Sequence, residues 1–286
     1  MTAAKTPDVK YRKDYKKPDF AVDSVYLTFA LFDGKTTVTA ETTFRRTNST
    51  ANNLVLNGEN MGLVSIARDG EALSDNQYTV NDDTLTVHNV PDTFTLKIVT
   101  EIKPEENTAL EGLYKSSGNY CTQCEPEGFR KITYYLDRPD IMTTFTTRIE
   151  ADKKSCPVLL SNGNCIDKGD LDGGRHYAVW EDPFKKPCYL FALVAGDLAS
   201  VHDTFTTMSG RKVDLYIYVN HGNEDKCTHA MESLKHSMKW DEEKYGREYD
   251  LDIFNIVAVN DFNFGAMEKK SLNVFNAKLI LAKPQT

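Results

Sequence analysis

A carboxylate beside a flexible turn is the chemical feature of the sequence that says most about function. The string NFGAMEK, residues 263–269, lies between two apolar segments with the pattern of buried strands. One interpretation is a β-turn in which Gly265 supplies a flexible backbone and Glu268 is merely solvated. The other is a strand edge that pairs with an extended peptide and ends in a carboxylate. Because short motifs are weak signals, the residues alone favour the plain turn.

Cys121 and Cys124 form a single CxxC pair in a stretch with the composition of a loop. A structural zinc site needs two further Cys or His ligands at matching spacing, and the other cysteines form no second pair. A thioredoxin-type redox pair would need the motif at a strand-to-helix junction. No two histidines are four residues apart, so no HExxH zinc motif is present, and His229 and His236 are expected at the surface. The spacing of these residues completes no catalytic centre.

The segments that must position these side chains are mostly strands. Apolar side chains alternate from Val25 to Leu31, Asp33-Gly34 supplies a hairpin turn, and the alternation resumes from Val38 to Phe44. Further strands are predicted at residues 63–67, 77–80, 84–87, 94–102, 132–135, 145–150, 176–180 and 189–194. Many short strands at this spacing predict an antiparallel sandwich or saddle of sheets.

A different pattern begins after Asp197, where we place a domain boundary. Residues 212–219 alternate as a strand, and residues 227–245 have the pattern of an amphipathic helix that stops at Gly246. Two buried strands are then predicted at residues 253–259 and 272–281. We therefore expect a mainly β protein, with one domain at residues 1–197 and the start of an α/β domain at residues 198–286.

Composition and charge exclude several classes of protein. The chain has 286 residues, and 34 Lys and Arg against 42 Asp and Glu leave a formal net charge of −8. This balance argues against a nucleic-acid coat or a binder of anionic membranes, because both need a basic face. The chain shows neither a signal-peptide core nor an apolar run that could span a bilayer. Six cysteines are too few for a disulfide scaffold, so we expect reduced thiols and a cytoplasmic location.

Several motifs together resemble a known enzyme family. Residues 265–268 resemble the GAMEN signature of the zinc aminopeptidases of peptidase family M1, and the wider text resembles the bacterial type. The matching stretches are residues 107–114, 121–125, 134–140, 160–164, 186–197, 237–243 and 248–253. The resemblance covers nearly the whole chain from Tyr11 onward. It implies a β-saddle N-terminal domain followed by the start of a thermolysin-like catalytic domain.

The resemblance also implies an activity, the release of N-terminal amino acids from peptides with a free N-terminus. A peptide's α-amine has a pKa of about 8 and is largely cationic at neutral pH. Glu125 and Glu268 would clamp this ammonium from two different domains. Backbone groups of the signature would bind the substrate strand, and an amide and an aromatic ring would wall the pocket for its first side chain. The substrate-binding residues implied in this way are Gln123, Glu125, Phe264, Gly265, Ala266, Met267 and Glu268.

The chain departs from the family pattern at two kinds of position. Lys269 stands where the signature has asparagine, and Ser271 stands where glycine is usual. Lys269 could pair with Glu268 and compete with the substrate ammonium, or it could point to solvent. The HExxH helix, the glutamate ligand and the transition-state tyrosine of the family have no counterpart in these 286 residues.

Without zinc there is no activated water and no Lewis acid for the scissile carbonyl. We therefore expect this chain to bind no metal, to contain no complete catalytic centre, and to be inactive without the C-terminal remainder of the enzyme. The main hypothesis is the N-terminal portion of a zinc aminopeptidase of broad specificity. The alternative is a non-catalytic, aminopeptidase-like module that binds peptides or serves as a scaffold, and a redox or zinc-ribbon role of the CxxC pair ranks third.

Overall fold

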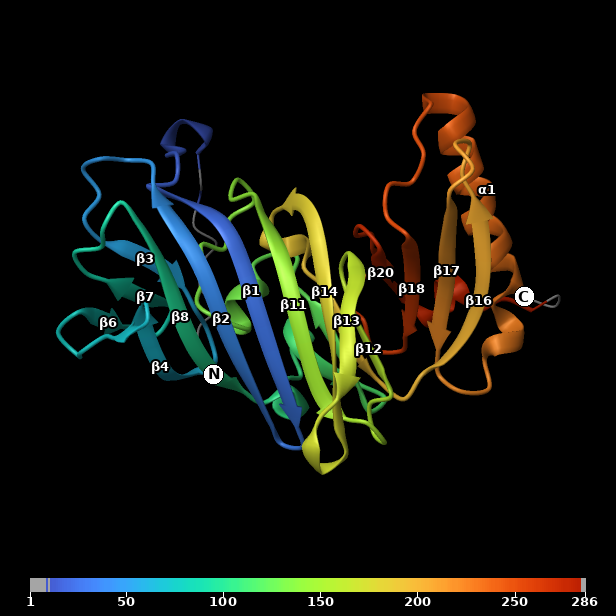
Figure 1. Cartoon of the computed structure of the whole chain (residues 1–286), viewed down its shortest axis with the longest axis horizontal. Coiled ribbons are helices and arrows are strands. Elements are labelled where there is room, and N and C mark those ends of the chain that lie inside the picture. Colours follow the sequence, from blue (N-terminus) through green and yellow to red (C-terminus); the bar gives the residue numbers. More distant parts are fainter. Residues whose placement is uncertain (1–8, 10, 284–286) are drawn as a thin grey trace.

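The computed structural model describes residue 9 and residues 11–283, which form a mainly β molecule in two parts (Figure 1). The first part contains β1 (Phe20–Phe32), β2 (Lys35–Arg46), β3 (Leu54–Asn57), β4 (Gly62–Arg68), β5 (Glu71–Ala72), β6 (Tyr78–Val80), β7 (Thr84–Val87), β8 (Thr93–Ile102), β9 (Gly112–Ser116), β10 (Asn119–Gln123), β11 (Thr143–Asp152), β12 (Val158–Ser161), β13 (Asn164–Asp170), β14 (Arg175–Lys186) and β15 (Leu193–Gly196).

The second part, as far as residue 283, contains β16 (Ala199–Thr206), β17 (Lys212–Val219), α1 (Thr228–Tyr245), β18 (Ile253–Val259), β19 (Ala266–Met267), β20 (Leu272–Asn276) and α2 (Ala277–Ile280). Short 3₁₀ turns lie at Arg12–Asp14, Pro104–Glu106, Phe129–Lys131, Asp172–Gly174, Cys188–Leu190 and Glu224–Lys226.

An eight-stranded sheet forms the curved back of the first part (Figure 1). Its order is β13-β14-β11-β1-β2-β8-β4-β5. Strands β1 and β2 form the hairpin predicted at Asp33-Gly34, where Gly34 has the positive φ of 73° that such a turn needs. Strand β1 also pairs with β11 in parallel, so it lies in the middle of the sheet. Alternate side chains of both hairpin strands are buried, as their sequence pattern predicts.

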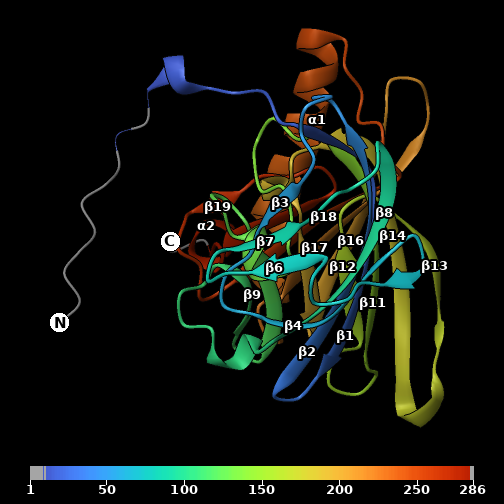
Figure 2. The same cartoon turned by 90° about the vertical axis from the view of Figure 1, so that its left-hand side faces the viewer.

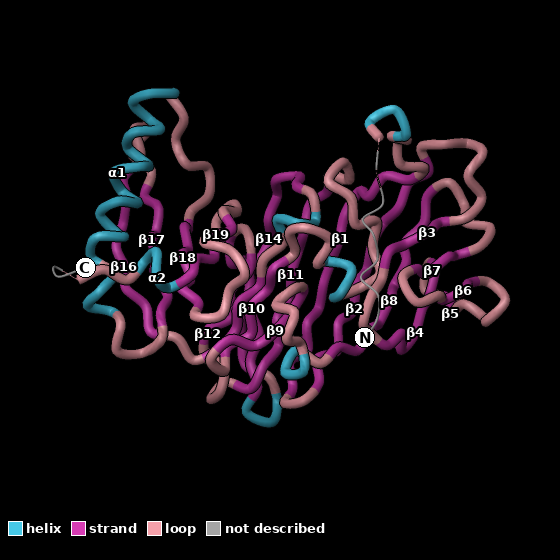
Figure 3. The backbone as a smooth tube through the Cα atoms, turned by 180° about the vertical axis from the view of Figure 1, so that it is seen from behind, coloured by secondary structure: helices cyan, strands magenta, loops and turns pink. Residues whose placement is uncertain are grey.

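Two smaller sheets face the large one and close the core. The sheet β12-β15-β10-β9 lies between the large sheet and the second part (Figure 3), and the sheet β3-β7-β6 lies at the other end (Figure 2). The aromatic rings of Phe29, Phe129, Phe145 and Phe191 fill the space between the layers with centroid separations of 5.4–6.0 Å. This core fixes β10, the strand that leads to Glu125.

The second part is a mixed sheet of order β16-β17-β18-β20-β19, with α1 on its outer face (Figure 1). Helix α1 buries Met231, Leu234 and Met238 against the sheet. It ends at Gly246, whose φ of 61° gives the left-handed cap expected from the sequence.

Both faces of β18 are buried, one against α1 and one against the first part. Ile256 and Ala258 belong to the cluster under α1, whereas Val257 and Val259 belong to the main core of the first part. One apolar core therefore continues across the domain boundary predicted near Asp197. The boundary itself, which falls between β15 and β16, remains a prediction.

The sequence analysis did not predict six of the strands, β3, β5, β9, β12, β13 and β16. Four predicted segments also differ from the structure. Residues 132–135 form no strand and make only a single bridge, between Tyr135 and Asn57, because a 3₁₀ turn precedes them. Residues 189–194 begin as a 3₁₀ turn and become a strand only at Leu193. Residues 272–281 form β20 and then the short helix α2. The CxxC stretch, expected as a loop, begins inside β10.

Candidate functional site

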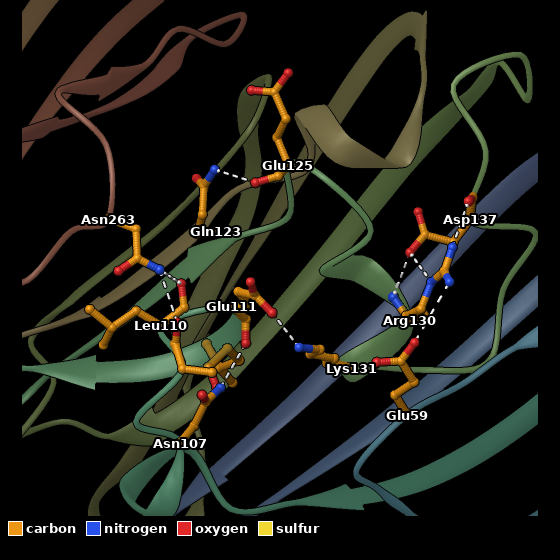
Figure 4. Close-up of polar contacts among 12 residues, drawn as sticks. Glu59, Asn107, Leu110, Glu111, Gln123, Glu125, Arg130, Lys131, Asp137 and Asn263 are labelled. Carbon is orange, nitrogen blue, oxygen red and sulfur yellow. Dashed lines mark hydrogen bonds and ion pairs between the residues drawn. The ribbon is translucent and has the colours of Figure 1, made fainter. Parts of the chain in front are cut away.

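The two carboxylates Glu125 and Glu268 lie on different elements and are both exposed. Glu125 follows the end of β10 in the first part, and Glu268 follows the two-residue strand β19 in the second. Neither carboxylate makes a hydrogen bond or ion pair with any described residue, and Figure 4 draws that of Glu125 without a contact. Both are therefore free to accept hydrogen bonds from a ligand.

Gln123 supports the backbone beside Glu125. It is the last residue of β10, and its side chain is 1% exposed. Its Nε2 donates a hydrogen bond of 2.9 Å to the carbonyl oxygen of Glu125 (Figure 4), whereas its buried Oε1 has no partner among the described residues. The pocket-wall role expected for Gln123 remains a prediction.

Strand β19 forms one edge of its sheet, because it pairs only with β20. The carbonyl of Gly265 accepts a hydrogen bond of 2.8 Å from the backbone N–H of Asn276, so this carbonyl is already in use. Because backbone groups of successive strand residues alternate in direction, those of Ala266 face the open edge. Met267 packs into the main core, and its backbone faces β20, where it is paired with Val274. The ligand role expected for Met267 remains a prediction. Of the signature residues implied by the resemblance to bind the substrate strand, Ala266 thus has backbone groups free for pairing, whereas the carbonyl of Gly265 does not.

Phe264 presents an aromatic surface directly before the signature. Its side chain is 48% exposed, and its ring meets that of buried Phe262 edge-on at a centroid separation of 6.4 Å. The ring is therefore accessible to a ligand's side chain, as a pocket wall requires.

Lys269 takes neither of the two positions considered from the sequence. It is 5% exposed, and its Nζ has no hydrogen-bond partner within the described residues, so it pairs with Glu268 no more than it points to solvent. Burial lowers the pKa of Lys269 to about 8, and the nearby Cys124, Cys121 and Glu125 oppose this shift. Glu268 and Lys269 follow the end of β19; the side chain of Glu268 is exposed and that of Lys269 is buried in the protein interior.

Ser271 explains why glycine is usual at its position. Its φ of 64° lies in the left-handed region, which favours glycine. In exchange, its buried hydroxyl oxygen accepts a hydrogen bond of 2.5 Å from the backbone N–H of Gly163 in the first part. The residue after Lys270 is thereby tied to the loop that precedes β13.

The CxxC pair has the features of core cysteines. Cys121 and Cys124 are free thiols with no exposed surface. Burial raises the pKa of both thiols to about 12, so they are protonated at neutral pH and weakly nucleophilic. Within residue 9 and residues 11–283, no group of three or more His, Cys, Asp or Glu side chains could hold a metal ion. The described residues therefore do not fit a zinc ion.

Sequence reasoning missed the residues that attach the signature to the first part. Asp261 and Asn263, in the loop between β18 and β19, hydrogen-bond to Ser116 and to the loop at residues 107–111. The only local signal was an Asn- and Asp-rich turn before Phe264. Its partners are about 150 residues away in the sequence, and no local pattern identifies them.

Family models match both parts of the chain. Residues 17–190 match the peptidase M1 N-terminal domain, and residues 229–286 match the peptidase family M1 domain. The chain belongs to peptidase family M1. This confirms the family resemblance inferred from the motifs, and the fold agrees with it.

Individual relatives and one solved structure resemble this chain over nearly its whole length. Aminopeptidase N of Escherichia coli (strain K12) is 55% identical over 98% of this chain, and Aminopeptidase N of Haemophilus influenzae is 54% identical over 97%. The crystal structure of Legionella pneumophila aminopeptidase A in complex with aspartic acid superposes with a TM-score of 0.93 at 38% identity, over 97% of this chain and 33% of that one.

A more distant structure shares the fold alone. The M1 zinc metallopeptidase of Deinococcus radiodurans, an E323A mutant bound to a Tyr-Ser-Ala substrate, has a TM-score of 0.76 at 15% identity, over 91% of this chain and 61% of that one. The chain spans about a third of the length of the curated relatives of the first group, 32% in each. It is thus homologous to the N-terminal part of aminopeptidase N.

Proposed function

We propose that this chain carries the amine-recognition half of the site of a zinc-dependent aminopeptidase, which releases N-terminal residues from peptides. The observation that carries the proposal is the pair Glu125 and Glu268, two exposed carboxylates that have no hydrogen-bond or ion-pair partner among the described residues. They follow strands of different parts of an M1 family member. Two carboxylates that converge on one ligand favour a cation that can donate several hydrogen bonds, which is what a free α-ammonium offers.

The remaining contacts of the proposed site would orient the peptide. The open edge of β19 at Ala266 offers backbone groups to an extended chain, and Phe264 offers an apolar surface to its first side chain. An acetylated or internal peptide nitrogen has no positive charge, so the carboxylates would reject it. Because only a free N-terminus would be bound, the proposed activity would be that of an exopeptidase.

Zinc is part of the proposal only because the full-length members of the family are zinc enzymes. In full-length members zinc would activate water and polarise the scissile carbonyl. The described residues hold no metal cluster, so the predicted contribution of this chain is binding and orientation of the substrate. We expect no peptide hydrolysis by the chain alone, and we expect the site to be completed by residues beyond those of this chain.

The expected cytoplasmic location also stays a prediction. No described helix is both long enough and apolar enough to cross a membrane.

The test measures binding of a free-amine peptide and its N-acetylated twin to the chain by calorimetry. We expect the free form to bind more tightly, and Glu125→Gln or Glu268→Gln to weaken its binding roughly 10- to 100-fold, the value of one charged hydrogen bond. Glu232→Gln, on the exposed side of α1, is the matched control and should bind as the unmodified chain does. Equal affinities for the two peptides would remove the clamp from this account.

The second candidate is a peptide-binding or scaffold module without catalysis. The observation in its favour is Lys269, a buried lysine at the signature position where the family has asparagine. The intact mass of the endogenous protein distinguishes the aminopeptidase from the peptide-binding or scaffold module. A species of about three times the 32.3 kDa of this chain supports the enzyme, because this chain spans 32% of its relatives. A species of 32.3 kDa supports the module.

A further inference from the structure

The loop between β18 and β19, residues 260–265, is anchored to buried side chains of β9. Ser116 Oγ donates a hydrogen bond of 2.8 Å to Asp261 Oδ2, and the backbone N–H of Asp261 donates one of 3.0 Å to Ser116 Oγ. The hydroxyl of Tyr114 donates a third, of 3.0 Å, to the carbonyl of Asp261. Because Tyr114 and Ser116 are both almost fully buried, they hold Asp261 against a rigid strand.

Two residues further on, Asn263 holds a second loop of the first part. Its Nδ2 donates to the carbonyls of Ala109, at 2.9 Å, and Leu110, at 3.5 Å (Figure 4). Leu110 has a φ of 56°, a conformation that is costly for a branched side chain and persists only where its surroundings impose it. Asn107 closes this loop from inside by donating to the carbonyl of Glu111 at 2.7 Å. The contact of Asn263 is thus made to a defined backbone conformation.

We propose that Ser116, Asp261 and Asn263 are positioning residues that set the separation between Glu125 and Glu268. The loop 260–265 leads directly into β19 and Glu268. Its anchor, β9, pairs with β10, the strand that leads to Glu125. Neither carboxylate is held by a hydrogen bond or ion pair to the residues that the structure describes, so their separation depends on how the two strands are docked. This inference rests on the proposed function, because it assumes that both carboxylates serve one ligand.

The test variant is S116A/N263A, which removes four of these hydrogen bonds. The matched control is Asn164→Ala. Asn164 makes two hydrogen bonds to Asp252, at the opposite end of β18, and so also joins the two parts. If the double variant fails to fold, N263A alone serves, because the Asn263 side chain is exposed.

The first readout is independent of any ligand. Nitroxide labels on E125C and E268C in a C165S background report their separation through dipolar broadening, since the other five native cysteines are buried. We expect the broadening to decrease or to spread over more distances in S116A/N263A, and to stay unchanged in N164A. Unchanged broadening in S116A/N263A, or an equal change in N164A, would overturn the positioning role.

The second readout is the preference for the free-amine peptide over its acetylated twin. We expect the preference to fall roughly 10- to 100-fold in S116A/N263A, because small displacements of binding groups have costs of this size. A retained preference would also count against the positioning role. An unmodified chain without any preference would overturn the proposed function instead, and the dipolar broadening would still decide whether these residues set the separation.

Discussion

At the scale of single residues, Lys269 brings together the signature and the CxxC stretch. Its amine lies in the interior near Cys121, Cys124 and Glu125, and no described group accepts a hydrogen bond from it. A polar group buried without a partner costs about 1–3 kcal/mol of stability, and more when it is charged. The buried amine of Lys269 therefore lowers the stability of the folded protein.

Replacing Lys269 by methionine should stabilise the protein in a pH-dependent way. The lysine pKa is about 8 in the folded protein and near the ordinary value of 10.5 in the unfolded chain. The unfolded state therefore binds more protons between these values, so this lysine's penalty is full below pH 8 and disappears as the pH rises toward 10.5. The penalty is on the order of 3 kcal/mol. Urea unfolding of both proteins at pH 7 and pH 10 measures it.

The difference between the two proteins is the quantity of interest, because other titrating groups are common to both. We expect Lys269→Met to be clearly more stable at pH 7 and nearly equal in stability at pH 10. A difference that stays constant with pH would show that the pKa of Lys269 is the same in the folded and the unfolded protein, as for a lysine that keeps its charge.

Ser271 predicts a ranking of variants. Ser271→Gly relieves the left-handed backbone but leaves the N–H of Gly163 without its acceptor, whereas Ser271→Ala loses that acceptor and keeps the strain. We expect the order of melting temperature to be serine, then glycine, then alanine, with about 1 kcal/mol separating the last two. An alanine variant as stable as the glycine variant would show that the backbone at this position is unstrained.

At the scale of elements, Gly246 separates backbone conformation from packing at the end of α1. A Cβ at this position would meet no atom within 4 Å, yet φ is 61°. Gly246→Ala should therefore cost about 1 kcal/mol through the left-handed cap alone. Gly62→Ala is the control, because its backbone is ordinary and its Cβ would lie 3.8 Å from the carbonyl of Glu101. Chemical denaturation of the two variants should show a loss only for Gly246→Ala.

Elements with a strong local pattern were predictable from the sequence. β17 and β18 have the predicted bounds, and α1 begins one residue later than predicted, because alternation and helical periodicity depend on neighbouring residues. Residues 132–135 were wrongly predicted as a strand, because apolar residues in an irregular segment show the same alternation. Phe129 and Tyr135 pack there around a 3₁₀ turn with their centroids 5.0 Å apart. Such packing is tertiary and leaves no local signal.

The candidate site was predictable to a different degree. The family resemblance implied the two carboxylates and the strand edge, and their role in binding stays a prediction. The burial of Lys269 beside Cys121 and Cys124 was not predictable, because these thiols precede it by about 150 residues. The hydrogen bonds between Ser116 and Asp261 span 145 residues. A motif specifies which groups occur together, whereas docking between distant segments decides which of them face solvent.

At the scale of the whole molecule, the continuous core predicts a single unfolding transition. The chain has two tryptophans, of which Trp180 lies in the main core and Trp240 lies on α1. In the W240F variant, the fluorescence of Trp180 reports unfolding of the first part. In the W180F variant, the fluorescence of Trp240 reports unfolding of the second part. Because β18 contributes to the core on both sides, we expect the two midpoints of fluorescence unfolding to coincide. Separate midpoints would show that the two parts unfold independently.

The parallel pairing of β1 with β11 has a consequence for synthesis on the ribosome. Ser24 of β1 pairs with Thr144 of β11, so one edge of β1 stays unpaired until a further 120 residues (144 − 24) have been synthesised. At 5–20 residues per second this delay is roughly 6–24 s. During that time the hairpin of β1 and β2 exposes an apolar face and the unpaired edge of β1, which can bind chaperones or other nascent chains. Slower translation between Thr93 and Thr143 should therefore increase aggregation of the newly made protein.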